Sequence, residues 1–117
     1  MKRINIETPT KLCGYANKAV TSWKLTYMGK ADEDGTYHYI LTDKENNRIK
    51  IRVEIHSETQ RMYDPTDSSN EEYVKIYCKD LNNPQKRGCT KFIRVEEFKE
   101  VRRVFNTIHD AGRQVMQ

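Results

Sequence analysis

Basic and aromatic residues, which suit ligand binding, alternate along residues 73–79. Every second residue of this segment is one or the other, in the order Tyr73, Lys75, Tyr77 and Lys79. Because successive side chains of a strand point to opposite faces, all four are expected on one solvated face. Aromatic rings stack on nucleobases, at about 1–3 kcal/mol per base, and cations neutralise phosphates. The segment therefore favours binding of single-stranded nucleic acid.

Further cations come from the segments before and after this one. Residues 48–55 alternate charged side chains with isoleucine and valine, and the cations that point away from the core are Arg48, Lys50 and Arg52. If 48–55 pairs with 73–79, two tyrosines lie among five cations. Three more cations, in a turn and on the strand after it, could extend this track: Lys86, Arg87 and Lys91. The alternative is an ordinary solvated sheet face, where such residues are common.

Groups that could perform catalysis or hold a metal form no recognisable set. The histidines at 38, 56 and 109 match no metal-ligand spacing, and the paired acids lie in predicted turns or at a helix start, where acids are common. The scattered glycines form no phosphate-binding loop. Cys78 shares a strand face with Val74 and Ile76, so it is expected to be a small buried hydrophobe. We therefore expect no enzyme activity, no cofactor and no metal site.

Hydrophobic periodicity predicts the elements that position these residues. Period-two segments near 23–28, 36–42, 48–55, 73–79 and 89–95 indicate five strands, and a helical pattern covers 9–19. A second helix is expected from Glu96, with acids in its first turns and an apolar stripe of Phe98, Val101, Phe105, Ile108, Gly112 and Val115. The fold class is therefore α+β. We expect an antiparallel meander of about five strands, with a short N-terminal helix and an amphipathic C-terminal helix packed on one face.

The chain of 117 residues fits one domain, 1–117, with a long mobile polar loop predicted at 56–72. Three cysteines without a CxxC pair are typical of reduced thiols inside cells. The first nine residues lack the apolar core of a signal peptide, and no stretch approaches the roughly 18 apolar residues of a membrane span. We expect a cytoplasmic protein without membrane contact, located in the host cell if its source is a virus.

The order of elements between Tyr73 and Ile108 is a strand, a basic turn containing glycine (Lys86-Arg87-Gly88), another strand and an amphipathic helix. This order, in under a third of the chain, loosely resembles the end of single-strand-binding domains of the PC4-like and Pur-repeat families. Those families have several antiparallel strands followed by one helix and grip single strands on the sheet. The N-terminal segment and the 56–72 loop depart from both patterns. The resemblance implies single-strand binding on the sheet.

Two further functions compete with nucleic-acid binding. Exposed Tyr, Arg and Trp in a compact chain also suit a protein-interaction module, because these residue types dominate binding hot spots. Such a module would be a small inhibitor or adaptor, of the kind that phages and mobile elements encode, bound to a host protein. An enzyme with an unfamiliar, metal-assisted site in the acidic loops is the weakest alternative. The C-terminal helix could also pair with its copy in a homodimer.

Overall fold

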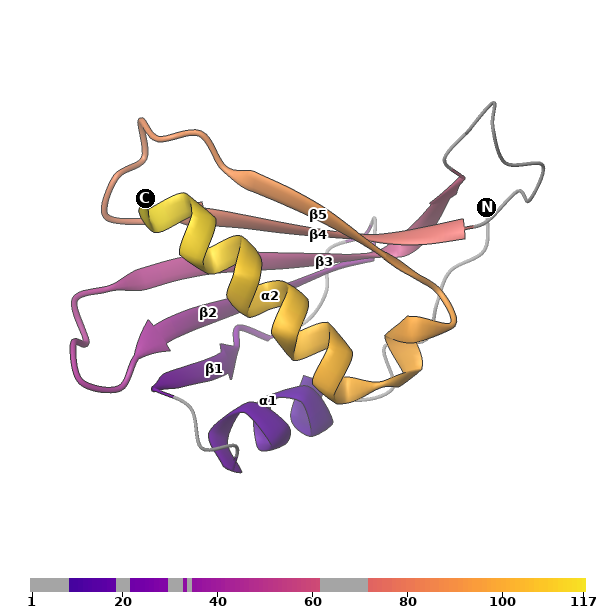
Figure 1. Cartoon of the computed structure of the whole chain (residues 1–117), viewed down its shortest axis with the longest axis horizontal. Coiled ribbons are helices and arrows are strands. Elements are labelled where there is room, and N and C mark those ends of the chain that lie inside the picture. Colours follow the sequence, from indigo (N-terminus) through magenta and orange to yellow (C-terminus); the bar gives the residue numbers. More distant parts are fainter. Residues whose placement is uncertain (1–8, 19–21, 30–32, 34, 62–71) are drawn as a thin grey trace.

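Five antiparallel strands form a single sheet in the order of the chain, β1-β2-β3-β4-β5 (Figure 1). The computed structural model describes residues 9–18, 22–29, 33, 35–61 and 72–117. The elements are α1 (Pro9–Lys18), β1 (Trp23–Tyr27), β2 (Thr36–Asp43), β3 (Lys50–Arg61), β4 (Glu72–Asp80), β5 (Cys89–Arg94), the 3-10 helix η1 (Glu97–Lys99) and α2 (Val101–Met116). The predicted α+β class, an antiparallel meander preceded and followed along the chain by a helix, is confirmed.

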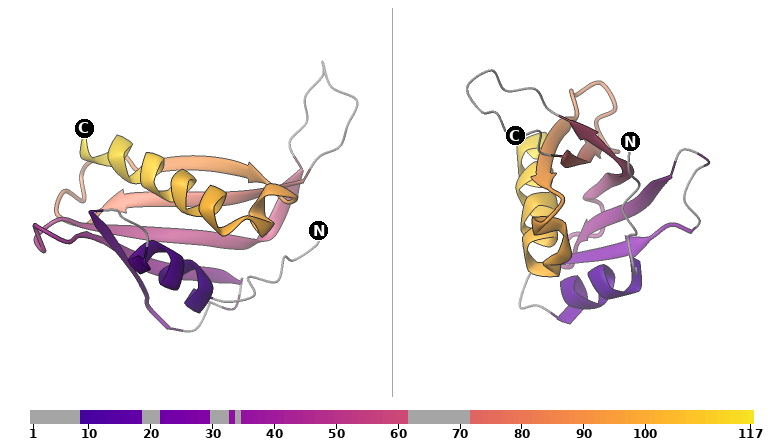
Figure 2. Two further views of the ribbon diagram at one scale, coloured as in Figure 1. Left: turned by 60° about the horizontal axis from the view of Figure 1, so that its bottom comes forward. Right: turned by 90° about the vertical axis from the view of Figure 1, so that its right-hand side faces the viewer.

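Both helices lie on the same face of the sheet, and we call this the inner face (Figure 2). α1 packs against β1 and α2, whereas α2 packs against β4 and β5. The rings of Tyr15 in α1 and Phe105 in α2 meet edge to face, with centroids 6.0 Å apart. The opposite face, which we call the outer face, has no helix over it in the described part of the chain.

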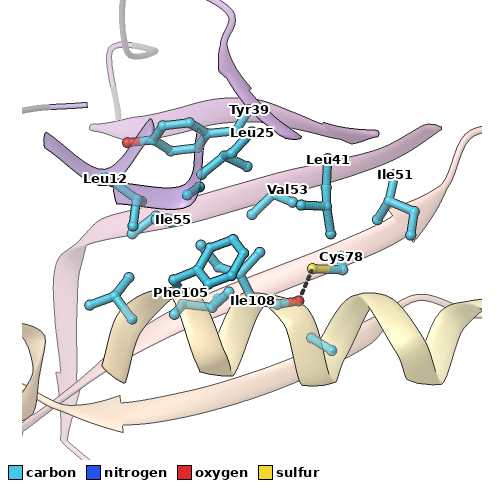
Figure 3. Packing of buried hydrophobic residues seen from close by; sticks show 14 of the residues in the cluster. Leu12, Leu25, Tyr39, Leu41, Ile51, Val53, Ile55, Cys78, Phe105 and Ile108 are labelled. Atoms are coloured by element: carbon cyan, nitrogen blue, oxygen red, sulfur yellow. Dashed lines mark hydrogen bonds between the residues drawn. The ribbon is translucent and has the colours of Figure 1, made fainter. Parts of the chain in front are cut away.

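The core lies between the inner face and the helices, as Figure 3 shows. Ile51, Val53 and Ile55 of β3 are fully buried there, and the residues between them are more exposed. This alternation is what a strand with one covered face requires. Cys78 of β4 is also fully buried, with its Sγ 3.9 Å from the Ile108 carbonyl oxygen, so the prediction of a buried hydrophobe is confirmed.

β3 is longer than predicted, and it replaces the first part of the expected 56–72 loop. The strand continues to Arg61, with Ser57 and Thr59 buried on the inner face. The register against β4 shifts between His56 and Gln60, which marks an irregularity of the β-bulge kind. The prediction was wrong over 56–61 because the inward positions there hold small polar residues, so the apolar alternation ends before the strand does. The rest of the predicted loop, 62–71, lies outside the described residues.

The start of the C-terminal helix also differs from the prediction. Residues 97–99 form the separate turn η1, and Glu100 is extended, so α2 begins at Val101 with no acid in its first turn. The expected acids therefore precede the helix. Of the predicted stripe, Phe98 and Val101 only pack partly against the core, while α2 also buries Val104 and Ala111. None of the described helices is long and apolar enough to cross a membrane.

Candidate nucleic-acid interface

The pairing of β3 with β4, on which the sequence-based hypothesis depended, is present. The register places Arg52 opposite Lys79, Glu54 opposite Tyr77, and His56 opposite Lys75. Inward neighbours of these residues, such as Val53 and Ile76, are fully buried. The even-numbered residues of β3 and the odd-numbered residues of β4 therefore share the outer face. Six of the predicted site residues share this face on the two strands. They are Lys50, Arg52, Tyr73, Lys75, Tyr77 and Lys79.

β5 adds two residues that were not predicted. Phe92 lies opposite Lys75, and Arg94 lies opposite Tyr73. Phe92 is 39 % exposed, whereas the next residue, Ile93, is 3 % exposed. We call the combined set the aromatic-cationic patch, and its members are Lys50, Arg52, Tyr73, Lys75, Tyr77, Lys79, Phe92 and Arg94.

Lys91, which was predicted to extend the track, lies on the other face of the sheet. It pairs with Ile76, which points into the core, and it has the same parity along β5 as buried Ile93. Residues 92 and 93 of this segment, Phe92 and Ile93, are both apolar, so these two residues do not decide which face of β5 points inward. A signal was available in Val95, which alternates with Ile93 and packs partly against the core.

The remaining three predicted cations lie at one end of the sheet. Arg48 precedes β3 in an exposed turn, and its carbonyl oxygen accepts a hydrogen bond from the Asn82 side chain after β4. Lys86 donates from Nζ to the carbonyl oxygen of Met116, 3.4 Å away, at the C-terminus of α2. Such a cation satisfies a terminal helix carbonyl and suits the helix dipole. Arg87 is exposed in the β4–β5 connection.

Acidic side chains also share this face of β3. Glu54 lies within the aromatic-cationic patch, and Glu58 has the same even parity along the strand. Glu54 faces Tyr77 across the strands, and its oxygens lie 3.7 Å from Arg52 Nη2 and 3.9 Å from His38 Nδ1. Its side chain is 18 % exposed. Glu54 therefore reduces the positive potential at the centre of the patch, and Lys50, Lys75, Lys79 and Arg94 supply the charge around it.

Groups suited to other chemistry are not brought together in the described residues. No cluster of three or more His, Cys, Asp or Glu side chains that could hold a metal ion occurs there. Cys13, Cys78 and Cys89 are free thiols in this structure. Burial, together with smaller effects of nearby Cys89 and Glu54, raises the pKa of the Cys78 thiol to about 12. Cys78 is thus protonated at neutral pH, whereas a thiolate is the reactive form.

The comparisons with known proteins do not supply a family. Neither the scan against protein-family models nor the searches of curated proteins and of solved structures found a match.

Proposed function

We propose that this protein binds single-stranded nucleic acid on the outer face of its sheet, without catalysing a reaction. The observation that supports the proposal most directly is the register of β3, β4 and β5. It places three aromatic rings, Tyr73, Tyr77 and Phe92, among five cations on a face that no described helix covers.

A single strand fits this surface better than a duplex does. Unpaired bases expose their ring faces, and aromatic side chains stack on them with little sequence preference. In a duplex the bases are stacked on one another, so the rings of Tyr73, Tyr77 and Phe92 would find no base face. The cations placed beside the rings would contact the phosphates that follow the bases along the strand.

The first prediction concerns salt dependence. The variant Lys50→Gln/Lys75→Gln/Lys79→Gln removes three patch cations and retains Arg52, whose ion pair with Glu54 is kept. Every cation that no longer neutralises a phosphate makes the slope of log K against log salt concentration shallower by about 0.7 for a single strand, so we expect a slope shallower by about 2. Fluorescence anisotropy of a labelled oligonucleotide at several salt concentrations measures this slope.

A matched control removes the same charge elsewhere. Lys11→Gln/Lys99→Gln/Arg102→Gln changes three exposed cations on α1, η1 and α2, away from the outer face. This variant should bind oligonucleotides like the wild type. Absence of binding by the wild type, or an equal loss of affinity in both variants, would refute the proposal.

The alternative is a protein-interaction module, and Glu54 favours it. A carboxylate among aromatic and basic side chains repels phosphate but matches a protein surface of mixed charge. Under this alternative, a pull-down from the source cell retains one stoichiometric protein after nuclease treatment, and Phe92→Ala abolishes its capture. Recovery of nucleic acid alone would exclude it.

A further inference from the structure

Gly88, immediately before β5, lies beneath the phenol end of Tyr77. A Cβ atom added to Gly88 would overlap the hydroxyl oxygen, Cζ and Cε2 of the Tyr77 ring. The direct partner of Tyr77 on β5 is Thr90, two residues further along. The ring therefore leans diagonally along the adjacent strand and covers the backbone at Gly88, as aromatic side chains do when they shield a glycine in a sheet.

Gly88 is required because a side chain would not fit there, and not because the backbone has a conformation that only glycine adopts. Gly29 and Gly35 have positive φ angles of 111° and 82°, in the region that favours glycine. Gly88 does not have a positive φ angle. An alanine could therefore adopt the same backbone, and the steric demand at Gly88 comes from the Tyr77 ring.

We infer that Gly88 is a positioning residue for Tyr77 within the aromatic-cationic patch. This inference rests on the proposed function, because the position of the ring matters when a base stacks on it. With no side chain at Gly88, the ring lies down over the start of β5, on the same outer face as Phe92. A side chain at residue 88 lifts or rotates the ring and removes one stacking surface, but leaves every cation in place.

The test is a double-mutant cycle made of the wild type, Gly88→Ala, Tyr77→Ala and the double variant. Loss of one base stack predicts that Gly88→Ala weakens oligonucleotide binding by about 5-fold to 150-fold. The slope of log K against log salt concentration should not change, because the cations that neutralise phosphates are all retained. In the Tyr77→Ala background, Gly88→Ala should have no further effect, since the overlapping ring is absent.

A matched glycine and a stability measurement separate positioning from misfolding. Nothing lies within 4 Å of a Cβ built on Gly14 in α1, so Gly14→Ala should bind like the wild type. The double variant should unfold at the same temperature as Tyr77→Ala. If Gly88→Ala binds oligonucleotide as tightly as the wild type, or if the effects of Gly88→Ala and Tyr77→Ala simply add, Gly88 does not position Tyr77. Either result would leave the proposed function standing. A wild type that binds no oligonucleotide would refute the proposed function and this role with it.

Discussion

Tyr39 in β2 combines a favourable ring with an unfavourable hydroxyl. The residue is fully buried, and its ring packs against Tyr27 with centroids 5.4 Å apart. Its hydroxyl has no hydrogen-bond partner among the described residues. A buried polar group without a partner costs about 1–3 kcal/mol. The ring therefore stabilises the core, whereas the hydroxyl opposes it.

Replacing Tyr39 with phenylalanine tests this balance. Tyr39→Phe keeps the ring and removes the unpaired hydroxyl, so we expect the free energy of unfolding to increase by about 1 kcal/mol. Urea unfolding of this variant measures the change, with the half-buried Tyr37→Phe as a control for loss of a hydroxyl near the surface. A less stable Tyr39→Phe variant would show that the hydroxyl is hydrogen bonded in solution.

Among the elements, α2 depends on a close approach to the sheet at Gly112. A Cβ atom at this position would lie 3.0 Å from Leu41 Cδ2 and 3.5 Å from Ile51 Cδ1. The first distance is tighter than ordinary contact, but Leu41 presents the end of a flexible side chain. At Gly112 the helix therefore packs closely over side chains of β2 and β3, and Gly112, Ala111 and Val115 are all buried.

Alanine and valine at position 112 should change the free energy of unfolding by different amounts. Gly112→Ala gains about 1 kcal/mol of helix propensity and loses a similar amount to displacement of Leu41, so its net effect should be within about 1 kcal/mol. Gly112→Val adds two further methyl groups against the sheet and should destabilise the fold by about 1–3 kcal/mol.

Chemical denaturation measures both Gly112 variants. Asn106→Val, at an exposed position of α2, controls for the helix propensity of valine, because Asn and Val have similar propensities. Equal stability of Gly112→Val and the wild type would show that α2 does not approach the sheet this closely.

Across the protein as a whole, burial of thiol and phenol groups makes the free energy of unfolding depend on pH in the alkaline range. Desolvation raises the pKa of Cys78 from 9.0 to about 12, and it also raises the pKa of Tyr39 and of Cys13. The folded state thus holds these protons more tightly than the unfolded state does. Their contribution to stability is fully present below the unfolded pKa and is lost as pH rises through the folded pKa.

We expect the free energy of unfolding to fall as the pH rises from about 9 to 12, the range set by the Cys78 thiol. Urea titrations at pH 7, 9, 10 and 11 measure this decline. The variant Cys78→Ala/Tyr39→Phe lacks two of these groups, so its free energy of unfolding should fall less steeply with pH, whatever its value at pH 7. If the free energy of unfolding falls equally steeply with pH in this variant and in the wild type, Cys78 and Tyr39 do not cause the decline.

Which side chains share a face within one strand was predictable from the amino-acid sequence. Alternation is a local property of the extended backbone, so the separation of Lys50 and Arg52 from Ile51 and Val53 could be predicted without knowing the neighbouring strands. The α+β class and the two helices were predictable for the same reason, because periodicity depends only on nearby residues. Strands 48–55 and 73–79 were therefore recognisable.

Which strands and faces meet depends instead on the folded chain. The pairing of β3 with β4 depends on contacts between residues far apart in the chain, and the length of β3 depends on burial of Ser57 and Thr59, whose types do not indicate it. The parity of β5, which exchanges Lys91 for Phe92 and Arg94 on the outer face, is set by packing against α2. The residues that β3 and β4 contribute to the candidate site were thus predictable from the sequence, whereas the contribution of β5 required the sheet.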